Sequence, residues 1–275
     1  MKKLIALLLA GCMIATMVVG CGSKEEAAEA PAATEEAAEA ESDLAYVKEK
    51  GTLVVGITDF APMDYKNEDG EWIGFDADMA KFFAGKLGVD VEFVEIDWDN
   101  KILELDAKSI DCVWNGMTLT DEVKAAMDCS NAYCNNAQVV IVPTEKAQQY
   151  QTVESLEGLA FAVEAGSAGE AEVTALGLDC TPVKAQSDAL MEVAAGTSDA
   201  AVIDALMAAA MVGPDTGYAD LTYTVSLNSE EYGVGFRKGS DLVAELNAFF
   251  ADIYADGTMQ DIAATYGVDA AVVAQ

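Results

Sequence analysis

Two polar turns in this sequence contain residue types suited to ligand binding, and both follow apolar runs. In the first, the run Cys112 to Trp114 leads into Asn115-Gly116-Met117-Thr118, and Thr120 stands where the N-cap of a following helix would lie. In the second, a run that ends before Glu164 leads into Gly166-Ser167-Ala168-Gly169 and a further helix. A strand that ends in a small polar turn before a helix exposes backbone N–H groups, which can bind carboxylates and other small polar groups.

A third apolar run, from Ala200 to Ile203, ends at Asp204 and is typical of a buried strand. A carboxylate left unpaired in such a place costs on the order of several kcal/mol, so it needs a cation or hydrogen-bond donors. Two roles therefore remain open for Asp204. It can bind a cationic group of a ligand, or it can cap the helix predicted from Ala205 to Met211.

Apolar runs and helix signals alternate along most of the chain, which predicts an α/β fold with mostly parallel sheets. The acids Asp76 and Asp78 are expected to stabilise the start of one helix, and Arg237 is expected at a solvent-exposed strand end. Strands are predicted over 53–57, 89–96, 112–114, 138–143, 160–163, 200–204, 223–227 and 232–236. Helices are predicted over 74–87, 101–108, 120–129, 187–195, 205–211, 242–254 and 259–266, and after residue 170.

Composition excludes several classes of function. The 275 residues include 48 acids and 15 bases, a net charge of −33, and Arg237 is the single arginine, so no nucleic acid partner is predicted. The chain has no histidine, which removes Ser-His and Cys-His catalytic pairs and the commonest zinc ligand. We therefore predict neither an enzyme nor a metal or cofactor site. Cys112 and Cys180 occupy strand-type positions and are expected to be buried thiols.

The N-terminus has the pattern of an export signal. Two lysines precede an apolar segment that is too short to span a bilayer, and Cys21 follows Val18-Val19-Gly20 as in a bacterial lipobox. Residues 1–20 are thus predicted to be a signal peptide and Cys21 to carry a lipid, with Cys12 as a rival site and cleavage without lipidation as a further alternative. Residues 21–43 are rich in Ala and Glu and are predicted to be a disordered tether.

Several motifs together resemble the family 3 extracellular solute-binding proteins, the amino-acid receptors of ABC importers. The matching positions of the first turn and its helix are Gly116, Met117, Thr118, Thr120, Asp128, Ser130 and Tyr133. The resemblance implies a two-lobed fold of the periplasmic-binding-protein type II class, with helices on both faces of each sheet and two hinge crossings. It places the first lobe over 44–133 plus 232–275 and the second over 134–231.

The resemblance also implies a site in the cleft between the lobes. Val123 departs from the family, because it occupies the position of the arginine that binds the ligand's carboxylate, and Glu164 stands where an apolar residue is common. Asp204 matches the aspartate that binds the ligand's α-ammonium. The predicted ligand-binding residues are Phe60, Trp114, Asn115, Gly116, Met117, Thr118, Ser167, Ala168, Gly169 and Asp204. Further pocket residues are Asp59, Met63, Val123 and Glu164, and Phe60 has a plain core position as its alternative.

Two classes of ligand follow. One is an amino acid whose carboxylate is held by backbone N–H groups, and the other is a cationic or carboxylate-free amine held by acids and aromatic rings. The expected partners are the small solute and the permease subunits of an ABC importer, for a monomeric lipoprotein on the outer face of the cell membrane. A dehydratase, an adhesin and a sensor module are weaker alternatives.

Overall fold

The computed structural model describes residues 42–275. The predicted signal peptide, Cys21 and nearly all of the predicted tether lie outside the described residues. Asp43 to Lys50 already form the first helix, α1, with Ser42 as its N-cap. Within the described part of the chain, no helix combines the length and the apolar character that a membrane crossing requires.

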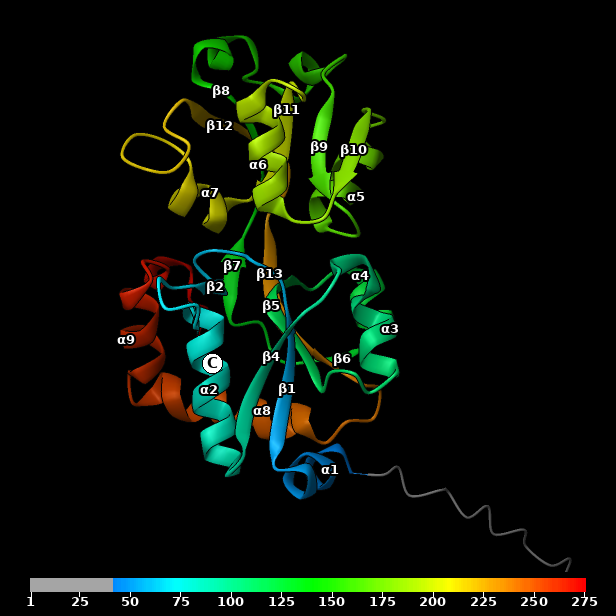
Figure 1. The fold of residues 1–275 in the computed structure, drawn as a ribbon, viewed down its shortest axis with the longest axis vertical. Helices are drawn as coiled ribbons and strands as arrows, with labels where there is room; N and C mark the ends of the chain where they lie inside the picture. Colours follow the sequence, from blue (N-terminus) through cyan, green and yellow to red (C-terminus); the bar gives the residue numbers. More distant parts are fainter. Residues whose placement is uncertain (1–41) are drawn as a thin grey trace, which may run out of the picture. The chain divides into compact units, whose positions relative to one another are not determined.

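The first of two large sheets has the strand order β4-β1-β5-β13-β6, with β7 also paired to β13 (Figure 1). The strands β4, β1 and β5 are parallel to one another, whereas β13 runs antiparallel to β5, β6 and β7. Their bounds are β1 Thr52–Ile57, β4 Asp90–Glu95, β5 Cys112–Thr118, β6 Asp128–Cys129, β7 Cys134–Asn136 and β13 Glu230–Phe236.

The second sheet has the order β10-β9-β11-β8-β12 and repeats this arrangement. The pairs β10·β9 and β9·β11 are parallel, and β8 is antiparallel to both β11 and β12. Its strands are β8 Gln138–Pro143, β9 Phe161–Glu164, β10 Cys180–Val183, β11 Ala200–Asp204 and β12 Leu221–Ser226. A separate hairpin joins β2 Tyr65–Lys66 to β3 Trp72–Ile73.

Both sheets are mixed, so the prediction of mostly parallel sheets is wrong. In each sheet the parallel strands are joined through helices, and the antiparallel partners are β13 and β8. The strand β13 follows the whole second sheet in sequence and returns to pair with β5. An alternation of strands and helices predicts parallel pairing only for strands joined by a helix, and says nothing of such a returning strand.

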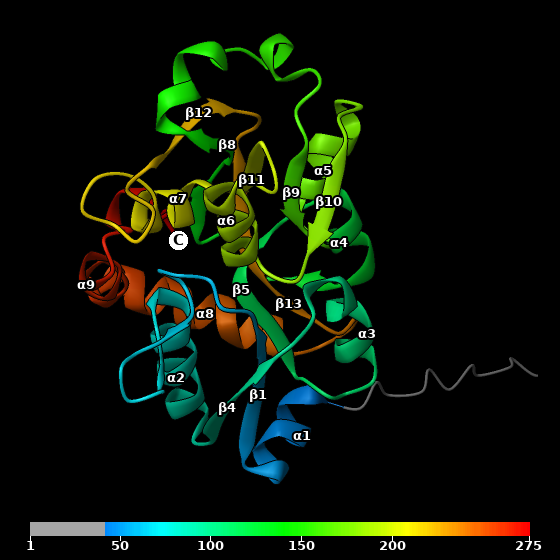
Figure 2. The ribbon, with the colours of Figure 1, turned by 45° about the horizontal axis from the view of Figure 1, so that its top comes forward.

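Helices cover the sheets in the manner expected of a two-lobed α/β fold. In the first lobe α2 contacts β1, β4 and β5, and in the second α6 contacts β8, β9 and β11 (Figures 1 and 2). The α-helices after α1 are α2 Phe75–Leu87, α3 Lys101–Asp106, α4 Asp121–Ala126, α5 Ala168–Ala175, α6 Gln186–Ala195, α7 Ala205–Met211, α8 Leu242–Ala255 and α9 Thr258–Thr265. The division of the chain between the lobes stays a prediction, and β7, at its first boundary, pairs in the first sheet.

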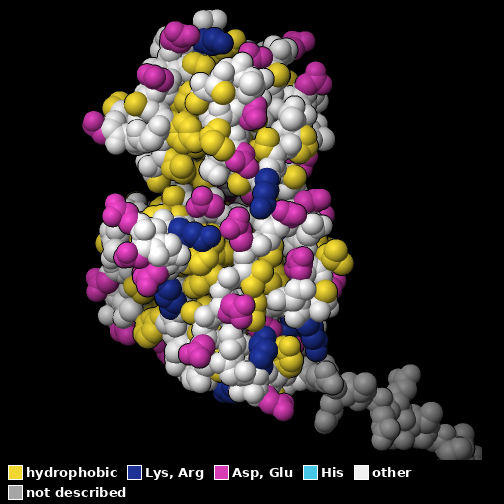
Figure 3. Space-filling model, viewed as in Figure 1, with side chains coloured by type: hydrophobic (Ala, Val, Ile, Leu, Met, Phe, Trp, Pro, Cys, Tyr) yellow, Lys and Arg dark blue, Asp and Glu magenta, His cyan; other side chains and the backbone are white. Residues whose placement is uncertain are grey.

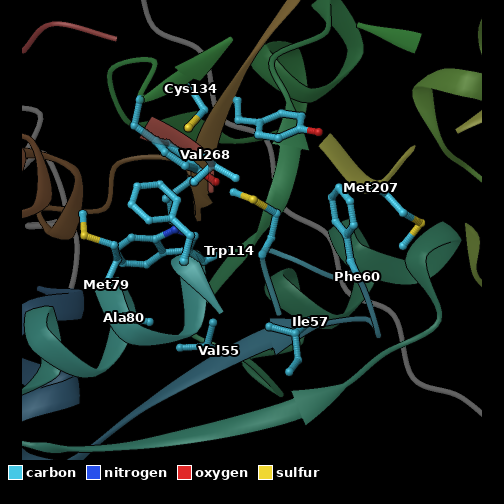
Figure 4. Close-up of a cluster of buried hydrophobic side chains, with 14 of the residues drawn as sticks. Val55, Ile57, Phe60, Met79, Ala80, Trp114, Cys134, Met207 and Val268 are labelled. Atoms are coloured by element: carbon cyan, nitrogen blue, oxygen red, sulfur yellow. The ribbon is translucent and has the colours of Figure 1, made fainter. Parts of the chain in front are cut away.

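The core of the first lobe is aromatic. Trp114 of β5 packs edge-on against Phe250 of α8 with 5.7 Å between ring centroids, and Phe83 of α2 and Tyr133 are its other ring neighbours. Figure 4 shows Trp114 inside this cluster, between α2 and the strands. Among the described residues the four cysteines are free thiols; Cys112 is buried as predicted, and Cys180 is half-buried.

Arg237 is buried, with 8% of its surface exposed, so the prediction of a solvated strand end is wrong. Its guanidinium lies 2.9 Å from the Asp43 carboxylate and donates to the carbonyl oxygen of Ile110 at 2.8 Å. The side chain therefore ties α1 and the segment before β5 to the end of β13. The sequence pattern failed here because the partner Asp43 is 194 residues away.

We expect Arg237→Met to lower the free energy of unfolding by about 3–5 kcal/mol, because it leaves Asp43 buried without its partner. Urea unfolding followed by circular dichroism measures this change. Lys86→Met is the matched control, since Lys86 pairs with Asp252 on the surface, where their side chains are 43% and 71% exposed. That variant should lose no more than about 1 kcal/mol. Equal losses in the two variants would contradict a structural role for the buried pair.

Candidate functional site

A cavity of about 650 Å³ lies between the turn that follows β5 and the turn that follows β9. Its wall therefore contains residues of both sheets. The predicted residues that line it are Phe60, Asn115, Gly116, Met117, Thr118, Val123, Glu164, Ser167, Ala168 and Asp204. The predicted residues that do not line it are Asp59, Met63, Trp114 and Gly169.

Trp114 faces the core rather than the cavity, so its predicted contact with the ligand does not agree with its position. The strand β5 extends to Thr118 instead of breaking at Asn115. Trp114 packs against Phe250 of α8 in the core, whereas the last residues of β5, 115–118, line the cavity. Met63 is likewise fully buried in the core.

The first turn is fixed by Asp76, which the sequence had suggested only as a helix-start residue. Asp76 is completely buried, and its Oδ2 accepts hydrogen bonds from the Gly116 N–H and the Tyr133 hydroxyl, both at 2.6 Å. Burial raises the pKa of Asp76 to about 7, and these two donors counteract the rise. Asp76 thus sets the position of the Gly116 backbone, and a purely capping role for it is corrected.

Glycine is required at position 116 for two reasons. Its φ is +56°, and a Cβ there would stand 2.4 Å from Cε1 of Phe60. Phe60 therefore packs directly on the backbone of the turn and makes an edge contact with Tyr232, with ring centroids 6.3 Å apart. Phe60 both lines the cavity and belongs to the core, so its two predicted positions are compatible.

The side chain of Asn115 is already engaged at this wall. Its Oδ1 accepts from the Thr58 N–H at 2.9 Å, and its Nδ2 donates to the Thr58 hydroxyl at 2.8 Å. Asn115 therefore holds the end of β1 against β5. Thr58 thus uses the amide oxygen of Asn115 and one of its two N–H donors, which leaves the second N–H for other acceptors.

The second turn has the geometry of a capped helix start. Ser167 is the N-cap of α5, and its Oγ accepts from the Glu170 N–H at 3.1 Å. The Glu170 carboxylate accepts from the Gly166 N–H at 2.7 Å, so the turn is bonded at both ends. The N–H groups of the first helical residues, Ala168 and Gly169, lack a partner within any α-helix. Such groups can receive hydrogen-bond acceptors of a ligand.

Asp204 is buried at the end of β11, with 4% of its surface exposed. It stands at the N-cap position of α7, but its side chain makes no capping hydrogen bond. Its Oδ1 accepts from Gln138 at 3.0 Å and from Tyr232 at 2.6 Å, and Asn136 is a third donor. Oδ2 accepts from Gln186.

The two carboxylate oxygens of Asp204 therefore differ. A carboxylate oxygen has about two lone-pair sites, so Oδ1 is saturated and Oδ2, which accepts only from Gln186 among the described residues, retains acceptor capacity. Burial, followed by the charge of Glu230, raises the pKa of Asp204 to about 7. A cation in the cavity would lower the free-energy cost of ionising Asp204.

Glu164 ends β9, the neighbour of β11, and is 3% exposed. Among the described residues its Oε1 has no hydrogen-bond partner, although the side chain lines the cavity. Burial, together with the charge of Asp204, raises the pKa of Glu164 to about 8. Two carboxyl groups thus share one wall of the cavity.

Comparison with known proteins identifies the family of this chain. Residues 53–269 match the family model of the bacterial extracellular solute-binding proteins, family 3. The chain belongs to this family. The L-cystine-binding protein TcyJ of Escherichia coli is 30% identical over 218 residues, which cover 78% of this chain and 82% of that protein. The arginine-binding extracellular protein ArtP of Bacillus subtilis is 27% identical over 269 residues, 95% of this chain and 96% of ArtP.

A solved structure of a relative supports the same assignment. A mutant of ArgBP from T. maritima superposes with a TM-score of 0.77 at 32% identity, covering 82% of this chain and 99% of that one. The type II two-lobed fold predicted from the motifs is confirmed. These relatives are binding proteins by name, in agreement with a receptor rather than an enzyme.

In this family 3 solute-binding protein, the cation nearest the cavity is a residue that the sequence analysis missed. Lys101, the first residue of α3, is 7% exposed and lines the cavity opposite the second turn. Its ammonium donates to the carbonyl oxygens of Gly166 at 2.9 Å and Trp98 at 3.2 Å. It also stands over the Trp98 ring at 4.8 Å from the centroid. Lys101 thus joins the first lobe to the second-lobe turn.

Val123 lines the cavity on α4 with 5% of its surface exposed. The absence of an arginine there leaves Lys101 as the one basic residue of the lining, beside acids such as Asp99 and Glu170. Burial lowers the pKa of Lys101, and the charge of Glu164 is the largest effect that opposes this. The signal in the sequence was a lysine at a helix start, three residues after Trp98.

Proposed function

We propose that this chain is the extracellular receptor of an ABC importer and that it captures a small polar solute, an amino acid, in the cavity between its two lobes. The observation that carries the proposal is Asp204, a buried carboxylate that lines the cavity with one oxygen saturated by protein donors and the other available. Such a group suits the α-ammonium of an amino acid. Amino-acid specificity among the relatives supports this ligand class.

The proposal includes the location of the protein in the cell. Lipidation at Cys21 would anchor the receptor to the outer face of the membrane, with residues 22–41 as the tether between the membrane and the folded domain that meets the permease subunits. Its net charge of −33 suits a water-exposed surface, and acidic side chains are spread over the face drawn in Figure 3. The receptor acts as a monomer and performs no catalysis.

A second candidate ligand is a carboxylate-free amine, and the charge of the lining favours it. The cavity wall contains six acidic residues and one basic residue, Lys101. Two N–H groups of Lys101 already donate to carbonyl oxygens, so only the third is left for a ligand carboxylate. Backbone N–H groups at the start of α5 are the alternative donors.

The test is a thermal-shift screen of the tether-free chain, residues 42–275, against amino acids, amines and neutral sugars. We expect at least one amino acid or amine to raise the midpoint of unfolding. A ligand at 100 times its Kd stabilises the folded state by about 2.7 kcal/mol, which shifts the midpoint by several degrees. Sugars serve as the matched negative class. A shift with sugars alone, or with none of the three classes, would overturn the proposed function.

A further inference from the structure

Glu164 is the one acidic residue of the cavity lining that is nine-tenths buried and has a carboxylate oxygen without any hydrogen-bond partner among the described residues. Its side chain is 3% exposed, and Oε1 has no partner among the described residues. A buried carboxylate oxygen without a donor costs free energy, which a folded protein avoids unless a ligand or water completes the site. This oxygen belongs to a residue of the cavity wall, so the missing donor can come from a ligand.

Asp204 and Glu164 provide two separate acceptor groups rather than one. They terminate neighbouring parallel strands, since β11 pairs with β9 through Ala200 opposite Phe161. Both oxygens of Asp204 accept hydrogen bonds, from Gln138, Gln186 and Tyr232 among others, whereas Oε1 of Glu164 has no donor among the described residues. The two carboxyl groups therefore differ in the hydrogen-bond donors that they still lack. Asp204 has one free acceptor position, and Glu164 has a whole oxygen to satisfy.

Lys101 forms no ion pair with Glu164 within the described part of the chain. Its Nζ donates instead to the carbonyl oxygens of Gly166 and Trp98, and its charge lowers the pKa of Glu164 without a direct contact. The other acids of the lining, Asp99, Asp121, Glu122 and Glu170, add further negative charge. Two buried carboxylates that both ionise need two positive charges nearby, and the protein places none directly on Glu164.

We propose that the ligand carries two cationic nitrogen atoms, and that Glu164 binds the second of them while Asp204 binds the first. The chemical class is thus a dibasic compound, either a cationic amino acid or its decarboxylated diamine. This inference rests on the proposed function, because it assigns the second cation to the same cavity. It makes Glu164 a determinant of specificity, at a position where the family motif indicates an apolar residue.

Matched ligands test the second cation without any variant. Isothermal titration of the wild-type chain with L-lysine and L-norleucine compares side chains with and without the terminal amine, and L-arginine and L-citrulline form a second pair. We expect the dibasic member of at least one pair to bind about ten- to a hundred-fold more tightly, as for a charge-assisted hydrogen bond. Equal affinity within both pairs would overturn the inference.

The Glu164→Gln variant tests the assignment to this residue. It preserves the shape of the side chain and should remove the preference for lysine over norleucine. Glu157→Gln is the control. It removes the same charge, but Glu157 is an exposed residue outside the cavity lining. A preference that persists in Glu164→Gln would overturn the role of Glu164.

Cadaverine and agmatine separate the two sources of a dibasic ligand. Tighter binding of cadaverine than of L-lysine identifies a diamine, and the reverse order identifies an amino acid; either supports two cationic nitrogens. The failures are also distinguishable. If neutral amino acids bind and dibasic compounds bind no better, only the present inference fails. If no amino acid and no amine binds, the proposed function fails with it.

Discussion

Asp204→Asn should weaken the binding of any amine-bearing ligand by at least about a hundred-fold, as measured by isothermal titration calorimetry. The substitution removes the negative charge that faces the cavity and replaces the free acceptor of Oδ2 by an amide donor. Loss of a charge-assisted hydrogen bond together with the ion pair accounts for about 3 kcal/mol, a factor of more than a hundred. No other change at the cavity is expected to have a larger effect on affinity.

The isosteric change is chosen because Asp204 also holds protein donors. Asp204→Ala would leave Gln138, Gln186 and Tyr232 without their acceptor and would confuse binding with folding. In Asp204→Asn, the amide oxygen can keep the donors at Oδ1. Asp179→Asn, on the surface of the second lobe, is the control for a lost charge. Affinity within threefold of wild type in a folded Asp204→Asn variant would remove Asp204 from the ligand site.

Local patterns predicted the parts of the site that are local in sequence. Asp204 was recognisable because a single acid ends an apolar run, and the second turn because small polar residues separate a strand from a helix, whereas residues 115–118, predicted as a turn, continue β5. The N-cap roles of Thr120 and Ser167 involve donors only three residues away. Short-range hydrogen bonds of this kind leave a readable spacing in the sequence.

The residues that were missed or misplaced act over long sequence separations. Lys101 meets the Gly166 carbonyl oxygen from 65 residues away, and Asp76 meets the Gly116 N–H from 40 residues away. Trp114 was misplaced because β5 continues for four residues beyond the apolar run, which assigns its side chain to the core face. Arg237 looked exposed because its carboxylate partner, Asp43, comes from the other end of the chain. The periodicity of apolar residues along the sequence gives no information about such long-range contacts.

The buried acids make the stability of the ligand-free chain depend on pH. Burial raises the pKa values of Asp204 and Asp76 to about 7 and that of Glu164 to about 8, above the ordinary values of 3.8 and 4.5. Between pH 4 and pH 8 the folded state therefore holds more protons at these groups than the unfolded state. The contribution of these three groups to the free energy of unfolding therefore falls as the pH rises through this window and is greatest on its acid side.

Ligand affinity should change with pH in the opposite direction. A cation binds the ionised forms of Glu164 and Asp204, so the carboxyl protons must leave before or during binding, and affinity falls as the pH drops below their pKa values of about 8 and 7. For a dibasic ligand whose amines stay protonated and which requires both carboxyl groups to be ionised, we expect roughly several hundred-fold weaker binding at pH 6 than at pH 8. Titration calorimetry in buffers of different ionisation enthalpy measures both the affinity and the protons released.

The variants assign this pH dependence to its groups. Glu164→Gln removes the group with the higher pKa, so the affinity of the variant should vary less between pH 7 and pH 8 and should release fewer protons on binding. Glu157→Gln should retain the full dependence, because Glu157 is an exposed residue outside the cavity lining. Affinity that is constant from pH 6 to pH 8 in the wild type would show that neither carboxyl group must ionise for the ligand to bind. In that case, an uncharged hydrogen-bonding ligand would replace the cation as the solute that fits this cavity.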